Sequence, residues 1–199
     1  MILISPFVYL NQYKKVCYSI NKEWENFSKK FKINLVIISH EINLNKLNKK
    51  KIKLIILSGG GDIYKIKKTS INKSRDKFDL KLINFGIKNN IPILAVCRSF
   101  QLIANFHGSK LFKKKSDKKH PIYFTKKVKS YDRKLIVNSY HLINIKTLPK
   151  EFDILAKNSN GFIEVAFNKN KKILCLMPHP EREFYSKSLI PLIKNYLIK

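Results

Sequence analysis

Two short apolar runs, each ending abruptly in residues that can carry chemistry, constrain the fold of this chain most. Leu54–Leu57 runs into the glycine cluster Ser58–Gly61, and Ile93–Val96 runs directly into Cys97. Runs of this length, without polar alternation and separated by a helical pattern, are typical of parallel strands buried on both faces. A cysteine between such a strand and a following helix lies where backbone N–H groups converge, so it is a candidate nucleophile.

The rest of the chain alternates strands and helices first and is rich in strands later. Strands are expected at Ile2–Tyr9 (with its exit loop), Leu35–Ile38, Ile52–Leu57, Leu135–Val137, Ile143–Ile145, Phe162–Phe167 and Ile173–Met177. Helices are expected at Ile20–Phe31, Arg75–Asn90, Arg98–His107 and Ser188–Ile198. The pattern predicts an α/β fold with one mostly parallel central sheet and helices on both faces. No linker or repeat divides it, so residues 1–199 are expected to form a single domain.

The net charge of +28 is the most prominent feature of the composition. A charge of this size suits nucleic acid or an anionic membrane as a partner. However, the lysines are scattered among many Asn and Ile residues, and all three are encoded by A/T-rich codons. We therefore attribute the charge mainly to composition, expect no nucleic-acid partner, and expect the surface field to favour small anionic substrates.

Membrane insertion and secretion are not expected. No apolar run approaches the ~20 residues that span a bilayer, and the N-terminus lacks the basic region of a signal peptide. The three cysteines are widely spaced and odd in number, which predicts neither a disulfide framework nor a metal site. A cytoplasmic location is expected. Cys17 and Cys175 are interpreted as buried structural thiols, and Asp62 as a helix cap.

A thiol nucleophile needs a general base and a group that orients this base. Of the five histidines, His179 has the best context, because it follows the strand at Ile173–Met177 and lies between two prolines. Glu181 is two residues further on, so it lies on the same side of an extended segment. His40 is interpreted as a loop residue, His107 as a helix-end residue near Gly108, and His120 as a solvated side chain.

Three motifs carry a resemblance to the class I glutamine amidotransferases. They are Leu57-Ser58-Gly59-Gly60, Cys97-Arg98-Ser99-Phe100-Gln101 and His179-Pro180-Glu181, in the family's order and spacing. More narrowly, Arg75-Asp76, Ile91-Pro92-Ile93-Leu94 and Val137-Asn138-Ser139-Tyr140-His141 resemble the gamma-glutamyl-gamma-aminobutyrate hydrolase branch of the gamma-glutamyl hydrolases.

The resemblance implies a three-layer, flavodoxin-like fold and a cysteine hydrolase that cleaves a gamma-glutamyl amide through a thioester. It implies that Cys97 is the nucleophile, His179 the base and Glu181 its orienter, with the N–H groups of Gly60 and Arg98 as the oxyanion hole. Gln101, Asn138, Ser139, Tyr140 and His141 would bind substrate. Neither a metal nor an organic cofactor is expected.

The chain departs from the family at two places. The nucleophile turn is typically Gly-x-Cys-x-Gly, whereas this chain has Ala95 and Ser99 in place of the glycines. Because these are the smallest replacements, we expect the turn to be kept with slightly altered packing. Met177-Pro178 stands where the family commonly has an aromatic residue, which changes the pocket wall more than the chemistry.

Two alternatives remain open. The chain could be a glutaminase subunit that passes ammonia to a synthetase or transferase partner. It could also be a basic nucleic-acid-binding protein without catalysis, although charge alone supports that interpretation.

Overall fold

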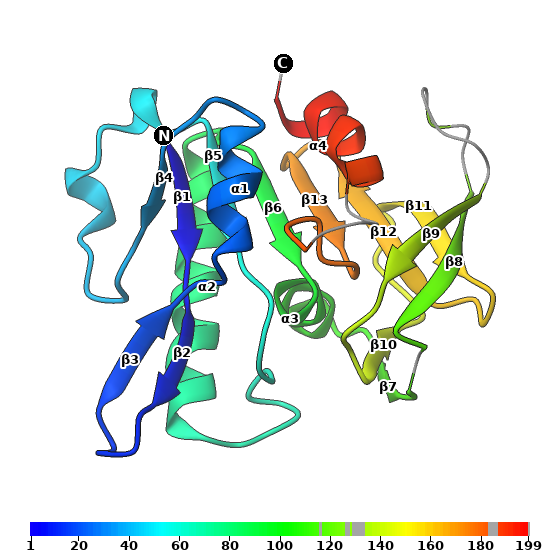
Figure 1. Ribbon diagram of the computed structural model, residues 1–199, viewed down its shortest axis with the longest axis horizontal. Coiled ribbons are helices and arrows are strands. Elements are labelled where there is room, and N and C mark those ends of the chain that lie inside the picture. The colour runs from blue at the N-terminus through cyan, green and yellow to red at the C-terminus, as the bar shows by residue number, and fades with distance from the viewer. Residues whose placement is uncertain (116, 126–127, 129–133, 183–186, 199) are drawn as a thin grey trace.

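The computed structural model describes residues 1–115, 117–125, 128, 134–182 and 187–198. Within these residues the centre of the molecule is a nine-stranded sheet in the order β4-β1-β5-β6-β13-β12-β11-β8-β9 (Figure 1). Parallel pairing joins β4 (Leu35–Ile37), β1 (Ile2–Ser5), β5 (Leu54–Leu57), β6 (Ile93–Val96) and β13 (Ile173–Leu176). Antiparallel pairing extends the sheet through β12 (Ile163–Asn168), β11 (Asp153–Asn158), β8 (Lys119–Phe124) and β9 (Lys134–Asn138).

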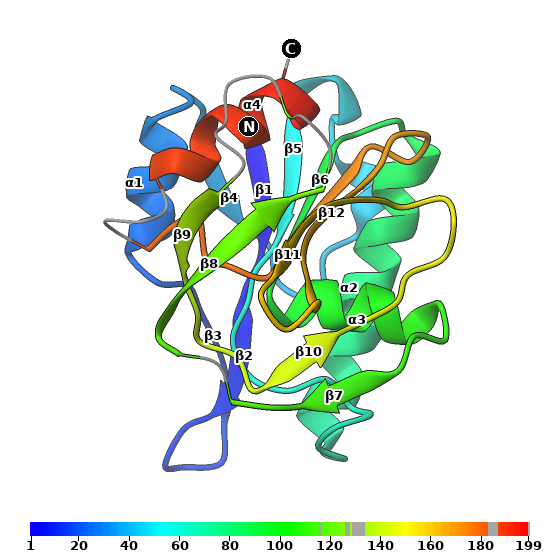
Figure 2. The same cartoon turned by 90° about the vertical axis from the view of Figure 1, so that its right-hand side faces the viewer.

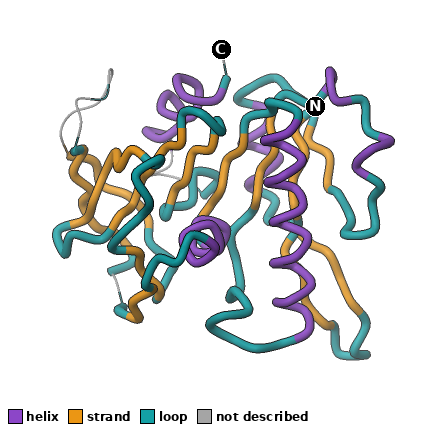
Figure 3. The backbone as a smooth tube through the Cα atoms, turned by 180° about the vertical axis from the view of Figure 1, so that it is seen from behind, coloured by secondary structure: helices purple, strands orange, loops and turns teal. Residues whose placement is uncertain are grey.

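Helices cover both faces of the parallel strands. One face carries α1 (Glu23–Lys29) and α4 (Ile190–Leu197), and the other carries α2 (Ser70–Lys88) and α3 (Arg98–Phe106) (Figures 1 and 3). Strand β5 explains the arrangement, because Leu54 and Ile56 join the core under α1 and α4. The alternate residues Ile55 and Leu57 join the core under α2 and α3. The predicted α/β fold, with a sheet that is largely parallel in its core and helices on both faces, is confirmed.

Smaller elements surround the ends of the sheet. A hairpin of β2 (Phe7–Leu10) and β3 (Val16–Ser19) projects from the end of β1, and β7 (Leu111–Lys113) pairs with β10 (Ile143–Ile145) (Figure 2). Short 3-10 turns cover Leu44–Lys46, Lys49–Lys51 and Lys187–Leu189. No helix in the described ranges is both long and apolar enough to cross a membrane.

Several predicted strands differ from the structure. The strand expected at Ile2–Tyr9 is two strands, because Pro6, which has no N–H to donate, separates β1 from β2. The expected half-buried strand Phe162–Phe167 is instead β12, which is buried throughout because β13 and β11 flank it. The expected buried strand Leu35–Ile38 is the edge strand β4, where Val36 is 37% and Ile37 50% exposed. Strand β11 was not predicted.

The second helix and one cysteine also differ from expectation. Helix α2 begins five residues earlier than predicted, because the Thr69 hydroxyl accepts from the Asn72 N–H at 3.2 Å and caps it. Asp62 is therefore not its cap. Cys17 is half-exposed on the projecting hairpin and is not a core thiol, whereas Cys175 is fully buried, which raises its pKa.

The basic segment Ser109–Lys134, predicted to hold loops and an edge hairpin, contributes β7 and β8, and its residues 116, 126–127 and 129–133 lie outside the described residues.

Candidate active site

The predicted catalytic residues meet where three neighbouring parallel strands end. The glycine cluster follows β5, Cys97 follows β6, and His179 lies three residues beyond β13. Strand β6 lies between β5 and β13, so Cys97 is at the middle of this edge. The carboxyl edge of a parallel sheet is the usual position for a ligand site in α/β folds.

Cys97 occupies a strained turn between β6 and α3. Its φ of 49° and ψ of −99° are unusual for a residue with a side chain, and such backbone costs about 1–3 kcal/mol. The Cys97 N–H donates to Leu176 O at 2.7 Å, which ties the turn to β13. The expected turn is present despite Ala95 and Ser99, and the Ser99 hydroxyl donates to Ser58 O at 3.1 Å across to the glycine cluster.

His179 is held by both its ring and its backbone. Glu181 Oε1 accepts from His179 Nδ1 at 2.7 Å, so Nε2 is left for the thiol side. The Asn138 side chain accepts from the His179 N–H at 2.8 Å and donates to its carbonyl at 2.9 Å. Burial lowers the pKa of His179, but the negative charge of the Cys97 sulfur and the contact with Glu181 outweigh this and raise it to about 9. These contacts therefore favour a protonated His179.

Gly59 is the contact point between the two reactive side chains. A Cβ built on Gly59 would lie 2.5 Å from His179 Cε1 and 3.3 Å from both His179 Nε2 and Cys97 Cβ. A glycine is thus required here by space rather than by backbone conformation, whereas Gly60 has a φ of 89°.

Arg75 fixes the path of the glycine cluster. Its guanidinium donates to the carbonyls of Ser58 at 2.8 Å, Gly59 at 3.1 Å and Gly60 at 2.5 Å. In a trans peptide the N–H points opposite to the preceding carbonyl. The N–H of Gly60 is therefore directed away from Arg75.

A buried charge cluster supports this loop and the start of α3. The Arg98 guanidinium donates to Asp79 at 2.9 Å and to Asp76 at 2.5 Å, and Arg75 Nε lies 3.8 Å from Asp79. The Ser5 hydroxyl also donates to Asp79, at 2.5 Å. The Arg98 side chain is thus occupied in holding α2, α3 and β1 together, so only its backbone N–H can face a substrate.

Comparisons with known proteins identify the family of the chain. The model of the glutamine amidotransferase class-I family matches residues 8–193. The chain belongs to this family. A gamma-glutamyl-CDP-amidate hydrolase of Campylobacter jejuni is 31% identical over 147 residues, which cover 73% of this chain and 70% of that protein.

Two further similarities are more distant. A glutamine-hydrolysing GMP synthase of Brachyspira hyodysenteriae is 30% identical over 78% of this chain, but the match covers only 29% of that longer protein. The crystal structure of a glutamine amidotransferase from Thermotoga maritima superposes with a TM-score of 0.68 at 17% identity, covering 98% of this chain and 82% of that one. The structural likeness supports the fold.

The predicted substrate-binding residues differ in the contacts that they make. Gln101 is buried and donates to Ile143 O at 3.2 Å. The Ser139 hydroxyl is buried without a hydrogen-bond partner among the described residues. Tyr140 is 56% exposed, with its ring edge-on to that of His179 at 5.6 Å. Asn138, as described above, contacts the His179 backbone.

A buried carboxylate that the sequence reasoning missed lies close to this group. Glu164 is fully buried, accepts from Asn158 at 2.8 Å, and lies 3.1 Å from His120 and 4.0 Å from His141. His120 is therefore buried, and the prediction of a solvated side chain is wrong. Burial lowers the pKa of His120, but the carboxylate of Glu164 has the larger effect, so the pKa of His120 is raised. For His141 burial has the larger effect, so its pKa is lowered. The only advance signal was a glutamate within the apolar run Phe162–Phe167.

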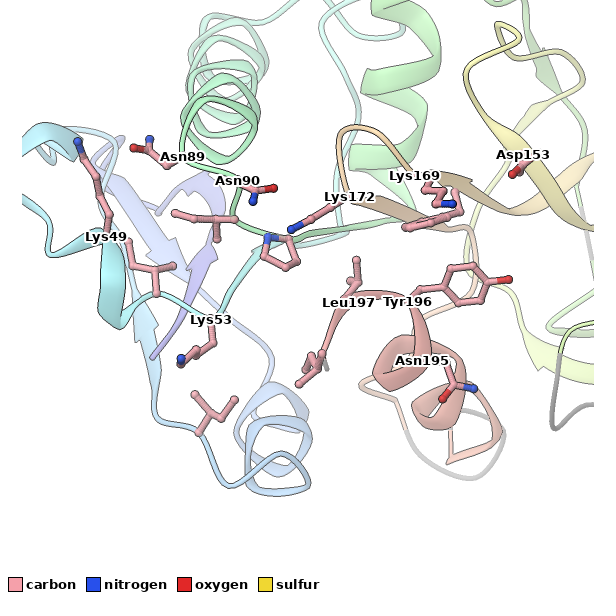
Figure 4. A pocket seen from close by; sticks show the side chains of 16 residues that line it. Lys49, Lys53, Asn89, Asn90, Asp153, Lys169, Lys172, Asn195, Tyr196 and Leu197 are labelled. Carbon is pink, nitrogen blue, oxygen red and sulfur yellow. The ribbon is translucent and has the colours of Figure 1, made fainter.

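The two ends of the parallel strands carry different cavities. A pocket of about 200 Å³ at the carboxyl edge is lined by the glycine cluster, His179, Glu181, Phe7 and Trp24. A larger cavity of about 950 Å³ lies at the amino ends of β5, β6 and β13, with Lys53, Lys172 and Leu197 in its wall (Figure 4). Of the predicted site residues, Gly60, His179 and Glu181 line the smaller pocket and none lines the larger cavity, so the smaller pocket marks the candidate active site. In the described part of the chain, no group of three His, Cys, Asp or Glu side chains could hold a metal ion.

Proposed function

We propose that the chain is a cysteine hydrolase of gamma-glutamyl amides with Cys97, His179 and Glu181 as its catalytic triad. The observation that carries this proposal is the set of contacts that runs from Glu181 through His179 to Cys97 at the carboxyl edge of the sheet. A nucleophile, a base and an orienting carboxylate in this order are what acyl transfer to a thiol requires.

The reaction proceeds through a thioester. The Cys97 sulfur attacks the gamma-carbonyl carbon, and the C–N bond breaks as the His179 imidazolium gives its proton to the departing amine. Water then adds to the thioester carbon while neutral His179 takes a proton from it. The C–S bond breaks, which releases glutamate and restores the thiolate and the imidazolium.

The N–H groups of Gly60 and Arg98 are proposed to stabilise the oxyanion. The Arg75 contacts turn the Gly60 N–H away from the guanidinium, and the first N–H groups of α3 have no partner within the helix. Two such donors, held rigid before reaction, lower the energy of the tetrahedral intermediate.

Gln101, Ser139, Tyr140 and His141 are proposed to line the glutamyl site. For Asn138 the contacts favour positioning His179, because both ends of its amide already bind the His179 backbone.

The proposed leaving group is a small anionic amine linked to a phosphate or nucleotide. The net charge of +28 favours anions. The Campylobacter jejuni relative carries the name of a gamma-glutamyl-CDP-amidate hydrolase. The gamma-glutamyl-CDP-amidate in that name is a substrate of this chemical class. Neither a metal nor an organic cofactor enters the proposed reaction. We propose that the enzyme is a single domain and works in the cytoplasm, where its thiol stays reduced.

Labelling tests the triad. A diazo-ketone analogue of glutamine should modify Cys97 selectively, as measured by mass spectrometry, and modification should be lost in His179→Ala. Cys97→Ala should lose hydrolysis of gamma-glutamyl amides by about 10⁴-fold or more while keeping the wild-type fold. Labelling of the half-exposed Cys17 in place of Cys97 would contradict the assignment.

The second candidate is a glutaminase subunit that supplies ammonia to a synthetase. The similarity to GMP synthases supports it. Glutamate release from free glutamine, measured alone and with a candidate synthetase, separates the two functions. Strong activity that depends on the partner would favour the subunit, whereas hydrolysis of gamma-glutamyl amides by the isolated chain favours the hydrolase.

A further inference from the structure

The candidate active site opens into a second, wider space. A groove of about 890 Å³ is lined by the segment from Ile20 to Glu23, by Asn26, and by Tyr140 and Arg182. Ile20, Asn21 and Arg182 line both this groove and the 200 Å³ pocket that contains His179. The two spaces are therefore adjacent, and Arg182 is one of the three residues that line both.

Arg182 is held in place relative to the catalytic base. Its backbone N–H donates to His179 O at 3.3 Å, and its Nε lies 3.8 Å from Glu181 Oε1. Its guanidinium carbon lies 4.1 Å from the centroid of the Tyr140 ring, a cation–π contact. Tyr140 in turn is edge-on to the His179 ring. The guanidinium thus has a defined position beside the imidazole, and Arg182 is still 29% exposed.

The reaction places the leaving group next to this arginine. The departing nitrogen takes its proton from His179, so it must lie against the imidazole. The substituent on the nitrogen can then extend into the groove that Tyr140 and Arg182 line beside the His179 ring. Arg182 is the cation at the entrance to that groove.

The charges of the groove suit a compact anion close to its entrance. Among the described residues that line the groove, the cations are Arg182 and Lys22 and the carboxylate is that of Glu23, while Asn21 and Asn26 add neutral amides that can bond a polar remainder. The Glu181 carboxylate lies 3.8 Å from Arg182 Nε on the side of the small pocket. A guanidinium presents planar paired donors that match phosphate oxygens, and stacking on an aromatic ring orients them in advance.

We propose that Arg182, oriented by Tyr140, binds the phosphate group of the leaving amine and determines the specificity of the enzyme for phosphorylated leaving groups. This inference rests on the proposed hydrolase function and extends it to a binding site for the leaving group.

The test compares two substrates in the full-length chain. One is a gamma-glutamyl amide whose nitrogen carries a phosphate or nucleoside diphosphate group, and the other is a neutral gamma-glutamyl anilide. Arg182→Gln should lower the ratio of kcat/KM between the phosphorylated and the neutral substrate by about 10- to 100-fold, the loss expected for a charge-assisted hydrogen bond. The loss should appear mainly in KM. Arg182→Lys should recover only part of it, because lysine lacks the planar fork.

The matched control is Lys172→Gln, which removes a cation from the cavity at the opposite end of the sheet and should leave the ratio unchanged. Equal losses on both substrates in Arg182→Gln would overturn the proposal, since they would mean that Arg182 only positions Glu181. If the wild type cleaves the anilide but does not prefer the phosphorylated amide, the proposed phosphate site at Arg182 is wrong and the proposed hydrolase function is still supported. If the wild type cleaves neither and Cys97 is not labelled, the proposed function fails and this inference falls with it.

Discussion

At the scale of single residues, the site depends on the positive charge of the His179 imidazole, which lies between the buried side chains of Cys97 and Glu181. His179 is 3% exposed, yet Cys97 and Glu181 raise its pKa to about 9 against the effect of burial. Removing an imidazolium from water is unfavourable unless negative groups compensate. The resting enzyme therefore keeps at His179 the proton that the departing amine later needs.

This raised pKa predicts a pH dependence of stability. A folded-state pKa above the ordinary value of 6.5 means that the folded protein binds the proton more tightly than the unfolded chain does. The stabilisation is complete below pH 6.5 and is lost as the pH rises through about 9. Urea unfolding should show wild-type stability falling over this range relative to His179→Gln. Nuclear magnetic resonance of the ring should show a lower pKa in Cys97→Ala; parallel pH profiles for wild type and His179→Gln would rule the ion pair out.

At the scale of elements, the loop after β5 acts as a rigid wall of the site. Three of its carbonyls accept hydrogen bonds from Arg75, whose guanidinium lies beside Asp79, and Asp79 in turn pairs with Arg98. Because these partners come from α2 and α3, the two helices and the loop are fixed together. Gly59 presents only hydrogen to His179, which brings the imidazole close to Cys97.

Gly59→Ala should therefore reduce activity without unfolding the protein. The new methyl group would meet His179 Cε1 at 2.5 Å, so the ring must move. A displacement of this kind costs about 10²-fold in kcat/KM. Gly161→Ala is the matched control, because Gly161 has a φ of 76° and open space around it. That variant should lose about 1–2 kcal/mol of unfolding free energy and keep its activity. Full activity in Gly59→Ala would contradict the close approach.

At the scale of the whole molecule, two long-range features govern the chemistry. The parallel pairing of β6 with β13 brings Cys97 and His179 together although they lie 82 residues apart in the sequence. The charge of +28 surrounds this site with a positive field. Such a field attracts anions over distances comparable to the Debye length, about 10 Å at 0.1 M salt.

Salt should consequently act on substrates according to their charge. Raising sodium chloride from about 20 to 300 mM should lower kcat/KM for the phosphorylated amide several-fold, because screening weakens the attraction. The neutral anilide should be nearly unaffected. Initial rates measured at low substrate concentration check this, and an equal salt effect on both substrates would indicate that the field does not steer the substrate.

The sequence alone was sufficient for the features that are local in the chain. The buried strands are short apolar runs, because strands covered on both faces need apolar side chains at every position. The turn at Cys97 follows from a strand running directly into a helix. The pairing of His179 with Glu181 was expected from their two-residue spacing in an extended segment, but Pro180 and Glu181 form a turn in which the Arg182 N–H donates to His179 O at 3.3 Å. The turn, and not strand alternation, brings the two side chains together.

Only the tertiary structure decided which distant groups support the site. Asn138 binds the backbone of His179 from 41 residues away. Glu164 lies beside both His120 and His141. Asp79 pairs with both Arg75 and Arg98. These partners come from different strands and helices, and the periodicity of apolar residues in the sequence does not predict which polar side chains will be in contact. A buried polar group must find a partner wherever the packing of the whole chain provides one. The same packing made β12 fully buried and left Val36 and Ile37 on an open edge, since burial depends on a strand's neighbours as well as on its own residues.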